Sequence, residues 1–63
     1  MRIEWSNRIR IVESYLKQHR LKPAKDMARR LLNEDHKVGY LMSYESSFLI
    51  QVVKAERIED LSL

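Results

Sequence analysis

The stretch Lys22–Leu32, KPAKDMARRLL, constrains the fold of this chain most, because it has the pattern of an amphipathic helix. Pro23 suits the first position of a helix, where a missing N–H loses no partner. One face carries apolar side chains at helical spacing, namely Ala24, Met27, Ala28 and Leu31. Another face carries cations three and four residues apart, namely Lys22, Lys25 and Arg29. The pattern predicts a helix from residue 23 to about residue 33 that packs on a core and presents cations outward.

A second helix is predicted before this stretch, from Ser6 to about Arg20. The Ser6 hydroxyl is a suitable N-cap, since it can accept a hydrogen bond from an early helical N–H. Ile9, Val12 and Leu16 then form one apolar stripe. Residues 1–5 alternate apolar and polar side chains, which fits either a short strand or an arm that packs on the core. The short join between the two helices is typical of an angled helical pair.

The C-terminal half has two interpretations after a predicted loop at residues 33–39. In the first, Ser43 caps a helix that runs to about Lys54 and buries Phe48 and neighbouring aliphatic side chains. In the second, residues 38–55 form a β-hairpin, because several of them are aromatic or β-branched. The segment from residue 40 onward has no glycine or proline, and we favour the helix. The expected fold is therefore mainly α, a small three-helix domain, with two helices plus a hairpin as the alternative.

The order of helix, turn and helix over about residues 23–53 resembles part of a helix-turn-helix DNA-binding domain. The resemblance rests on DMARRL, in which Ala28 takes the place of the small residue that this family has in the middle of a helix. Met27 and Leu31 stand at the flanking apolar positions. The resemblance implies a DNA-binding protein of the transcription-regulator type whose recognition helix is Ser43–Lys54.

Length and charge limit the possible functions further. Sixty-three residues make a single small domain, residues 1–63, and a chain this short gains little stability from its own core. There is no cysteine, so a partner chain is the remaining source of added stability. Residues 1–30 hold nine Lys and Arg against three Asp and Glu, a balance of +6, whereas residues 31–63 have a balance of −3. This uneven distribution of charge predicts one basic face that can follow a phosphate backbone.

The leading hypothesis from these patterns is a small, basic nucleic-acid-binding regulator. It contacts DNA phosphates through the candidate residues Arg8, Lys22, Lys25, Arg29 and Arg30. The alternative is a non-enzymatic adaptor or inhibitor of phage or plasmid type, whose basic half meets an acidic protein partner. RNA binding is a third possibility.

The run FLIQVV has five apolar residues in six, more than one face of one helix in a small domain needs. This excess predicts a second covered surface, either another part of the fold or a partner chain, and we expect a homodimer contact. The candidate self-association residues are Tyr44, Phe48, Ile50 and Val52.

Other functional classes find no support in the sequence. His19 and His36 lack a third ligand at a recognisable spacing, so no metal site is expected. No cysteine nucleophile or glycine-rich phosphate loop is present, and neither an enzyme nor a cofactor is expected. No apolar run approaches the roughly 20 residues that span a bilayer, and the N-terminal ten residues lack the apolar core of a secretory signal. The expected location is the cytoplasm.

Overall fold

The computed structural model describes residues 2–61 and consists of three α-helices and a short 3₁₀ helix. The elements are α1 (Arg2–Lys17), α2 (Leu21–Val38), α3 (Ser43–Lys54) and η1 (Ile58–Asp60). The prediction of a mainly α, three-helix domain is confirmed. Residues 2–61 contain no strand, so the alternative of a hairpin over residues 38–55 is wrong.

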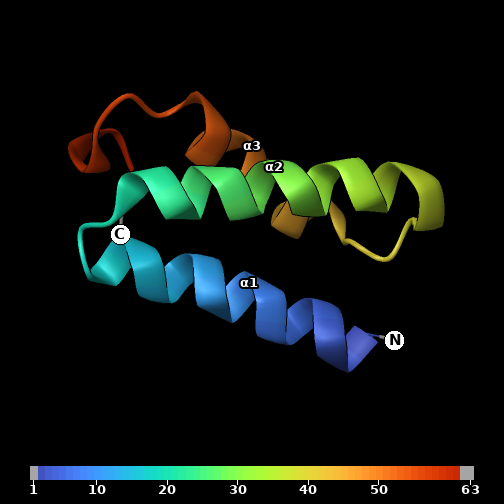
Figure 1. The fold of residues 1–63 in the computed structure, drawn as a ribbon. Helices are drawn as coiled ribbons and strands as arrows, with labels where there is room; N and C mark the ends of the chain where they lie inside the picture. Colours follow the sequence, from blue (N-terminus) through green and yellow to red (C-terminus); the bar gives the residue numbers. More distant parts are fainter. Residues whose placement is uncertain (1, 62–63) are drawn as a thin grey trace.

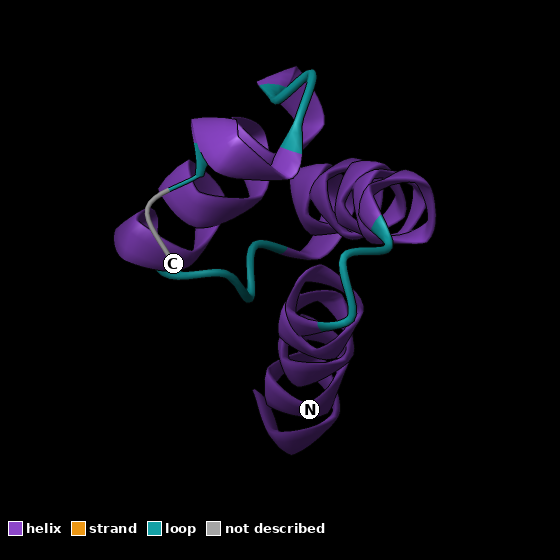
Figure 2. Ribbon diagram, turned by 90° about the vertical axis from the view of Figure 1, so that its left-hand side faces the viewer, coloured by secondary structure: helices purple, strands orange, loops and turns teal. Residues whose placement is uncertain are grey.

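The helix α2 is the centre of the fold, because it packs against both other helices, while α1 and α3 make few contacts with each other. Seen along α2, the other two helices lie on different sides of it (Figures 1 and 2). On each helix, residues spaced three and four apart form one stripe that faces a common core. The buried apolar side chains are Trp5, Ile9, Val12, Leu16, Ala24, Ala28, Leu31, Leu49, Val52 and Ala55.

The first helix begins four residues earlier than predicted. Residues 2–5 are helical rather than a strand or an arm, and Ser6 lies inside α1 instead of capping it; Met1 lies outside the described residues. The physical reason is Trp5, which is only 5% exposed. It stands four residues before Ile9, so a helical backbone places its indole on the same buried stripe.

The turn between α1 and α2 is a Schellman motif in which a histidine takes the left-handed position. The N–H of Arg20 donates to the carbonyl of Tyr15 (2.8 Å), and the N–H of His19 donates to that of Leu16 (3.0 Å). These two bonds satisfy carbonyls that the end of α1 leaves unpaired. They require a positive φ at His19, which is 59°. A residue with a Cβ is strained in this region, where glycine is not.

We therefore expect His19→Gly to raise the free energy of unfolding by about 0.5–1 kcal/mol, since it relieves the left-handed strain. The melting temperature should rise by about 2–8 °C, measured by circular dichroism. His36→Gly is the matched control, because His36 is an exposed residue within α2 and should lose stability on the same change. Equal effects of the two substitutions would contradict a special backbone role for His19.

The second helix exceeds its predicted bounds at both ends. It starts at Leu21, which makes Pro23 the third helical residue, and the missing N–H still falls within the first turn, where it has no helical partner. It continues to Val38, so the loop predicted at residues 33–39 is wrong except at its last residue. Gly39 ends the helix with a φ of 68°, and its N–H donates to the carbonyl of Asp35 (2.7 Å).

Two carboxylates fix the connection from α2 to α3, which is only residues 39–42. An Asp35 side-chain oxygen accepts the N–H of Leu41 at 2.7 Å. The Glu45 carboxylate, which is buried in the first turn of α3, accepts the N–H of Met42 at 2.9 Å. Met42 is the N-cap of α3, so Ser43, predicted as the cap, is instead the first helical residue. Because both bonds hold backbone N–H groups of the connection itself, the connection has a defined shape.

The C-terminal turn is closed by Asp60. Its carboxylate accepts the N–H groups of Glu56 (3.0 Å) and Arg57 (3.2 Å). These two bonds favour the charged form and hold the pKa of Asp60 below its ordinary value. Since the folded pKa is depressed, this contribution to stability is present above the unfolded pKa and is lost as the pH falls through the folded pKa.

Candidate nucleic-acid interface

The five predicted phosphate-binding residues line two open grooves that flank α2. The first groove has a volume of about 440 Å³ and is lined by Leu21, Lys22, Lys25, Asp26 and Arg29. It holds three cations and one carboxylate. Arg29 Nη1 lies 3.9 Å from Asp26 Oδ1, and both side chains are more than half exposed, so water screens this pair and leaves the guanidinium accessible.

The second groove runs between α1 and α2 and has a volume of about 300 Å³. Its lining residues are Arg8, Ile11, Met27, Arg30, Leu31 and Glu34. Arg8 donates a hydrogen bond to the Glu34 carboxylate, and its guanidinium carbon lies 5.6 Å from the centroid of the Trp5 ring. Arg8 is thus already engaged by an anion and an aromatic face, and it bridges α1 to the C-terminal part of α2.

Lys25 is also engaged within the fold. Its ammonium donates to the carbonyl of Ala55 at 2.7 Å, in a partly buried position. Ala55 is the C-cap of α3, so Lys25 satisfies a carbonyl at the end of that helix and lies where the helix dipole favours a cation. Thirty residues separate the two partners, and for this reason the sequence alone gave no sign of the contact.

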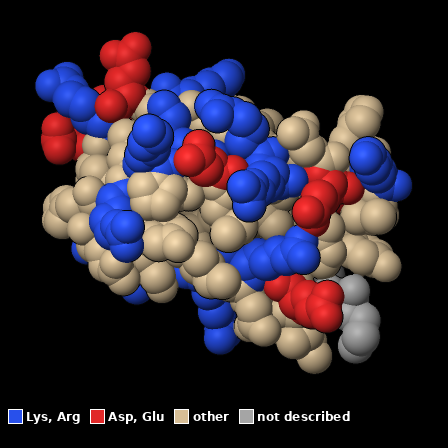
Figure 3. Space-filling model, in the orientation of Figure 1, with Lys and Arg blue, Asp and Glu red and all other residues tan. Residues whose placement is uncertain are grey.

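Of the five predicted residues, those left most accessible are Lys22, Arg29 and Arg30 on α2. All three are exposed, and within residues 3–61 neither Lys22 nor Arg30 forms a salt bridge. Figure 3 shows Lys and Arg side chains gathered over the face that carries α2, with acidic side chains between them. The structure therefore brings three of the five predicted residues together as exposed charges on one helix, and gives Arg8 and Lys25 internal partners.

The predicted self-association residues lie in different environments on α3. Val52 is fully buried in the core of the chain itself, so its apolar surface is already covered. Phe48 is half-buried, whereas Ile50 is exposed and Tyr44 is 70% exposed. Five further exposed apolar residues stand outside the predicted list, namely Ile3, Ile11, Val38, Tyr40 and Met42. The signal that could have found the last three is Gly39, which ends α2 directly after Val38 and leaves Tyr40 and Met42 on the connection.

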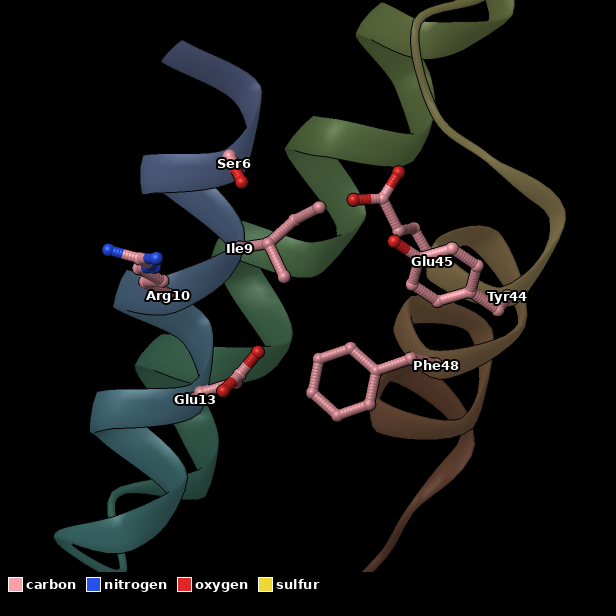
Figure 4. Close-up of a pocket in the computed structure, with 7 residues that line it drawn as sticks. All are labelled: Ser6, Ile9, Arg10, Glu13, Tyr44, Glu45 and Phe48. Carbon is pink, nitrogen blue, oxygen red and sulfur yellow. The ribbon is translucent and has the colours of Figure 1, made fainter. Parts of the chain in front are cut away.

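A third cavity, of about 220 Å³, lies between α1 and α3 and is lined by Ser6, Ile9, Arg10, Glu13, Tyr44, Glu45 and Phe48. Ile9 and Phe48 point toward each other across it from the two helices (Figure 4). The cavity exists because α1 and α3 both pack on α2 and only weakly on one another.

Two further observations concern the described part of the chain. No group of three or more His, Asp or Glu side chains gathers there in a way that would hold a metal ion. None of its helices combines the length and the apolar character that crossing a membrane requires. Comparisons of the chain with protein-family models, with curated proteins and with solved structures yield no match.

Proposed function

We propose that this protein is a small cytoplasmic regulator that binds nucleic acid by contacting phosphates through the exposed face of α2. The observation that carries the proposal is the accessible set of cations Lys22, Arg29 and Arg30 on one helix between two open grooves. Contacts of this kind position a protein on a duplex without specifying its sequence. The proposal includes no enzymatic activity.

The α2–α3 pair is proposed as the helix-turn-helix-like part of the domain. Its connection of four residues begins with Gly39, which supports this assignment, since turns of that family are short and usually begin with glycine. The exposed side chains of α3 include only one cation, Lys54. We therefore assign the phosphate contacts to α2 rather than to α3.

We also propose that the protein acts as a homodimer. The three proposed contacts of one copy neutralise few phosphates, and binding through so few contacts is weak at physiological salt. Two copies double the number of contacts on one duplex and raise the effective concentration of the second binding face.

An electrophoretic mobility shift on duplex DNA of random sequence, at a series of salt concentrations, tests the proposal. If Lys22, Arg29 and Arg30 each contact one phosphate, the logarithm of affinity should fall against that of salt with a slope of about −3 for each copy bound. A matched duplex RNA distinguishes DNA from RNA as the target. Absence of any shift at micromolar protein and low salt, with the helices formed, would remove the regulator and favour the adaptor that binds an acidic protein.

A further inference from the structure

Five exposed apolar side chains come from one end of the three-helix domain. They are Ile3 in the first turn of α1, Val38 in the last turn of α2, Tyr40 and Met42 on the connection, and Tyr44 in the first turn of α3, and we call them the apolar end. Figure 1 shows that the N-terminal end of α1 and the C-terminal end of α2 lie at the same end of the molecule. Ile3 and Tyr44 are 68% and 70% exposed, values that the fold of a single copy leaves unexplained.

The apolar end is held in place by contacts beneath it. The ring of Tyr40 packs edge-on against that of Trp5, with centroids 5.9 Å apart, so the connection is fastened to α1. The bonds from Asp35 and Glu45 to the N–H groups of Leu41 and Met42 fix the backbone on either side. A surface that is ordered before binding loses little conformational entropy when a partner covers it, so its apolar area is available to stabilise a complex.

The area and the charge of the apolar end favour a second copy of this chain as its partner. The five side chains expose on the order of 600 Å², which approaches the roughly 800 Å² per partner of a stable protein interface. The charged residues next to them in the sequence are two cations, Arg2 and Lys37, and two anions, Glu4 and Glu45, so the balance of charge is zero. Glu4 and Lys37 are exposed, and neither forms a salt bridge within residues 3–61. In a two-fold arrangement, the charges of one copy can pair with the opposite charges of the other. The same residues carry no excess of positive charge that would attract a phosphate backbone.

We propose that two copies pair through their apolar ends about a two-fold axis, with Glu4 of each copy facing Lys37 of the other. In a two-fold interface, both subunits use the same patch, so that patch must be complementary to itself. The apolar end, with both signs of charge beside it, has this property. The inference specifies the homodimer of the proposed function and does not depend on nucleic-acid binding. The test therefore measures mass without nucleic acid, so failure of one proposal is distinguishable from failure of the other.

Sedimentation equilibrium of the unmodified chain, from micromolar to millimolar concentration, should show a monomer–dimer equilibrium. Tyr44→Lys should weaken the dimer by about tenfold or more, because Tyr44 is the most exposed residue of the apolar end and the change places a cation in an apolar contact. Ile11→Lys is the matched control, since Ile11 is an exposed apolar residue on α1 outside the apolar end, and it should leave the dimer intact. Circular dichroism verifies the helices of each variant. A chain that stays monomeric throughout, or a control that dissociates as much as Tyr44→Lys, would overturn the proposal.

A charge exchange tests the orientation of the two copies. Glu4→Lys alone and Lys37→Glu alone should each weaken the dimer, because each change brings like charges together across the axis. The double variant Glu4→Lys with Lys37→Glu should restore it, because the pairs are opposite again. A double variant that is weaker than both single ones would exclude this two-fold arrangement.

Discussion

Replacing Leu31 by alanine should lower the free energy of unfolding by about 2–5 kcal/mol, because it opens a cavity in the fully buried centre of α2. A chain of 63 residues has a total stability of roughly 3–9 kcal/mol, so this single change removes much or all of it. The effect is large because Leu31 is fully buried and belongs to α2, the helix that packs on both other helices.

Urea unfolding followed by circular dichroism measures the effect of Leu31→Ala. Ile50→Ala is the control, since Ile50 is an exposed apolar residue on α3 and its truncation should change stability by less than about 0.5 kcal/mol. A Leu31 variant as stable as the Ile50 variant would mean that α2 is not the centre of the core.

The double variant Lys22→Glu with Arg30→Glu should lose detectable binding to duplex DNA. Both side chains are exposed, and they lie in the two grooves on either side of α2, so the change places anions in each groove. Removing two phosphate contacts also reduces the salt slope by about 2, and two new anions repel the backbone. Because neither residue pairs with another charge in residues 3–61, the helices should remain formed.

The control for this charge reversal is Lys17→Glu with Lys54→Glu, which changes the net charge by the same amount. Lys17 ends α1 and Lys54 ends α3, and neither lines the two grooves beside α2. Fluorescence anisotropy with a labelled duplex should show weak loss for the control and strong loss for the α2 variant. Equal loss for both would mean that binding follows overall charge and not the face of α2.

The sequence predicted the helices through the residues that each one buries. The stripes at Ile9, Val12 and Leu16 and at Ala24, Ala28 and Leu31 repeat at helical spacing, and both are buried. The predicted span Ser43–Lys54 agrees with α3 as the structure has it. In these segments the local pattern and the tertiary packing favour the same conformation.

The predicted helix boundaries are wrong where the sequence shows no apolar periodicity. The last turns of α2 are polar and show no apolar stripe, so only the glycine at position 39 marked their end. A proline near the start of α2 indicated a boundary two residues too late, because the first turn tolerates it at more than one position.

The candidate site was predicted only as a list of cations. Their partners come from distant parts of the chain: Glu34 is 26 residues from Arg8, and Ala55 is 30 residues from Lys25. Spacing along a helix reveals which charges share a face, but it carries no information about which of them another element will neutralise.

The central position of α2 also determines how the chain folds. Its two packing partners are the helices directly before and after it in sequence, so most native contacts join neighbouring elements. Each helical hairpin closes a short loop, which costs little chain entropy before the first contacts form. Such low contact order is typical of proteins that fold in microseconds to milliseconds. Either helical hairpin can form first. The side of α2 that this hairpin leaves uncovered then packs against the remaining helix.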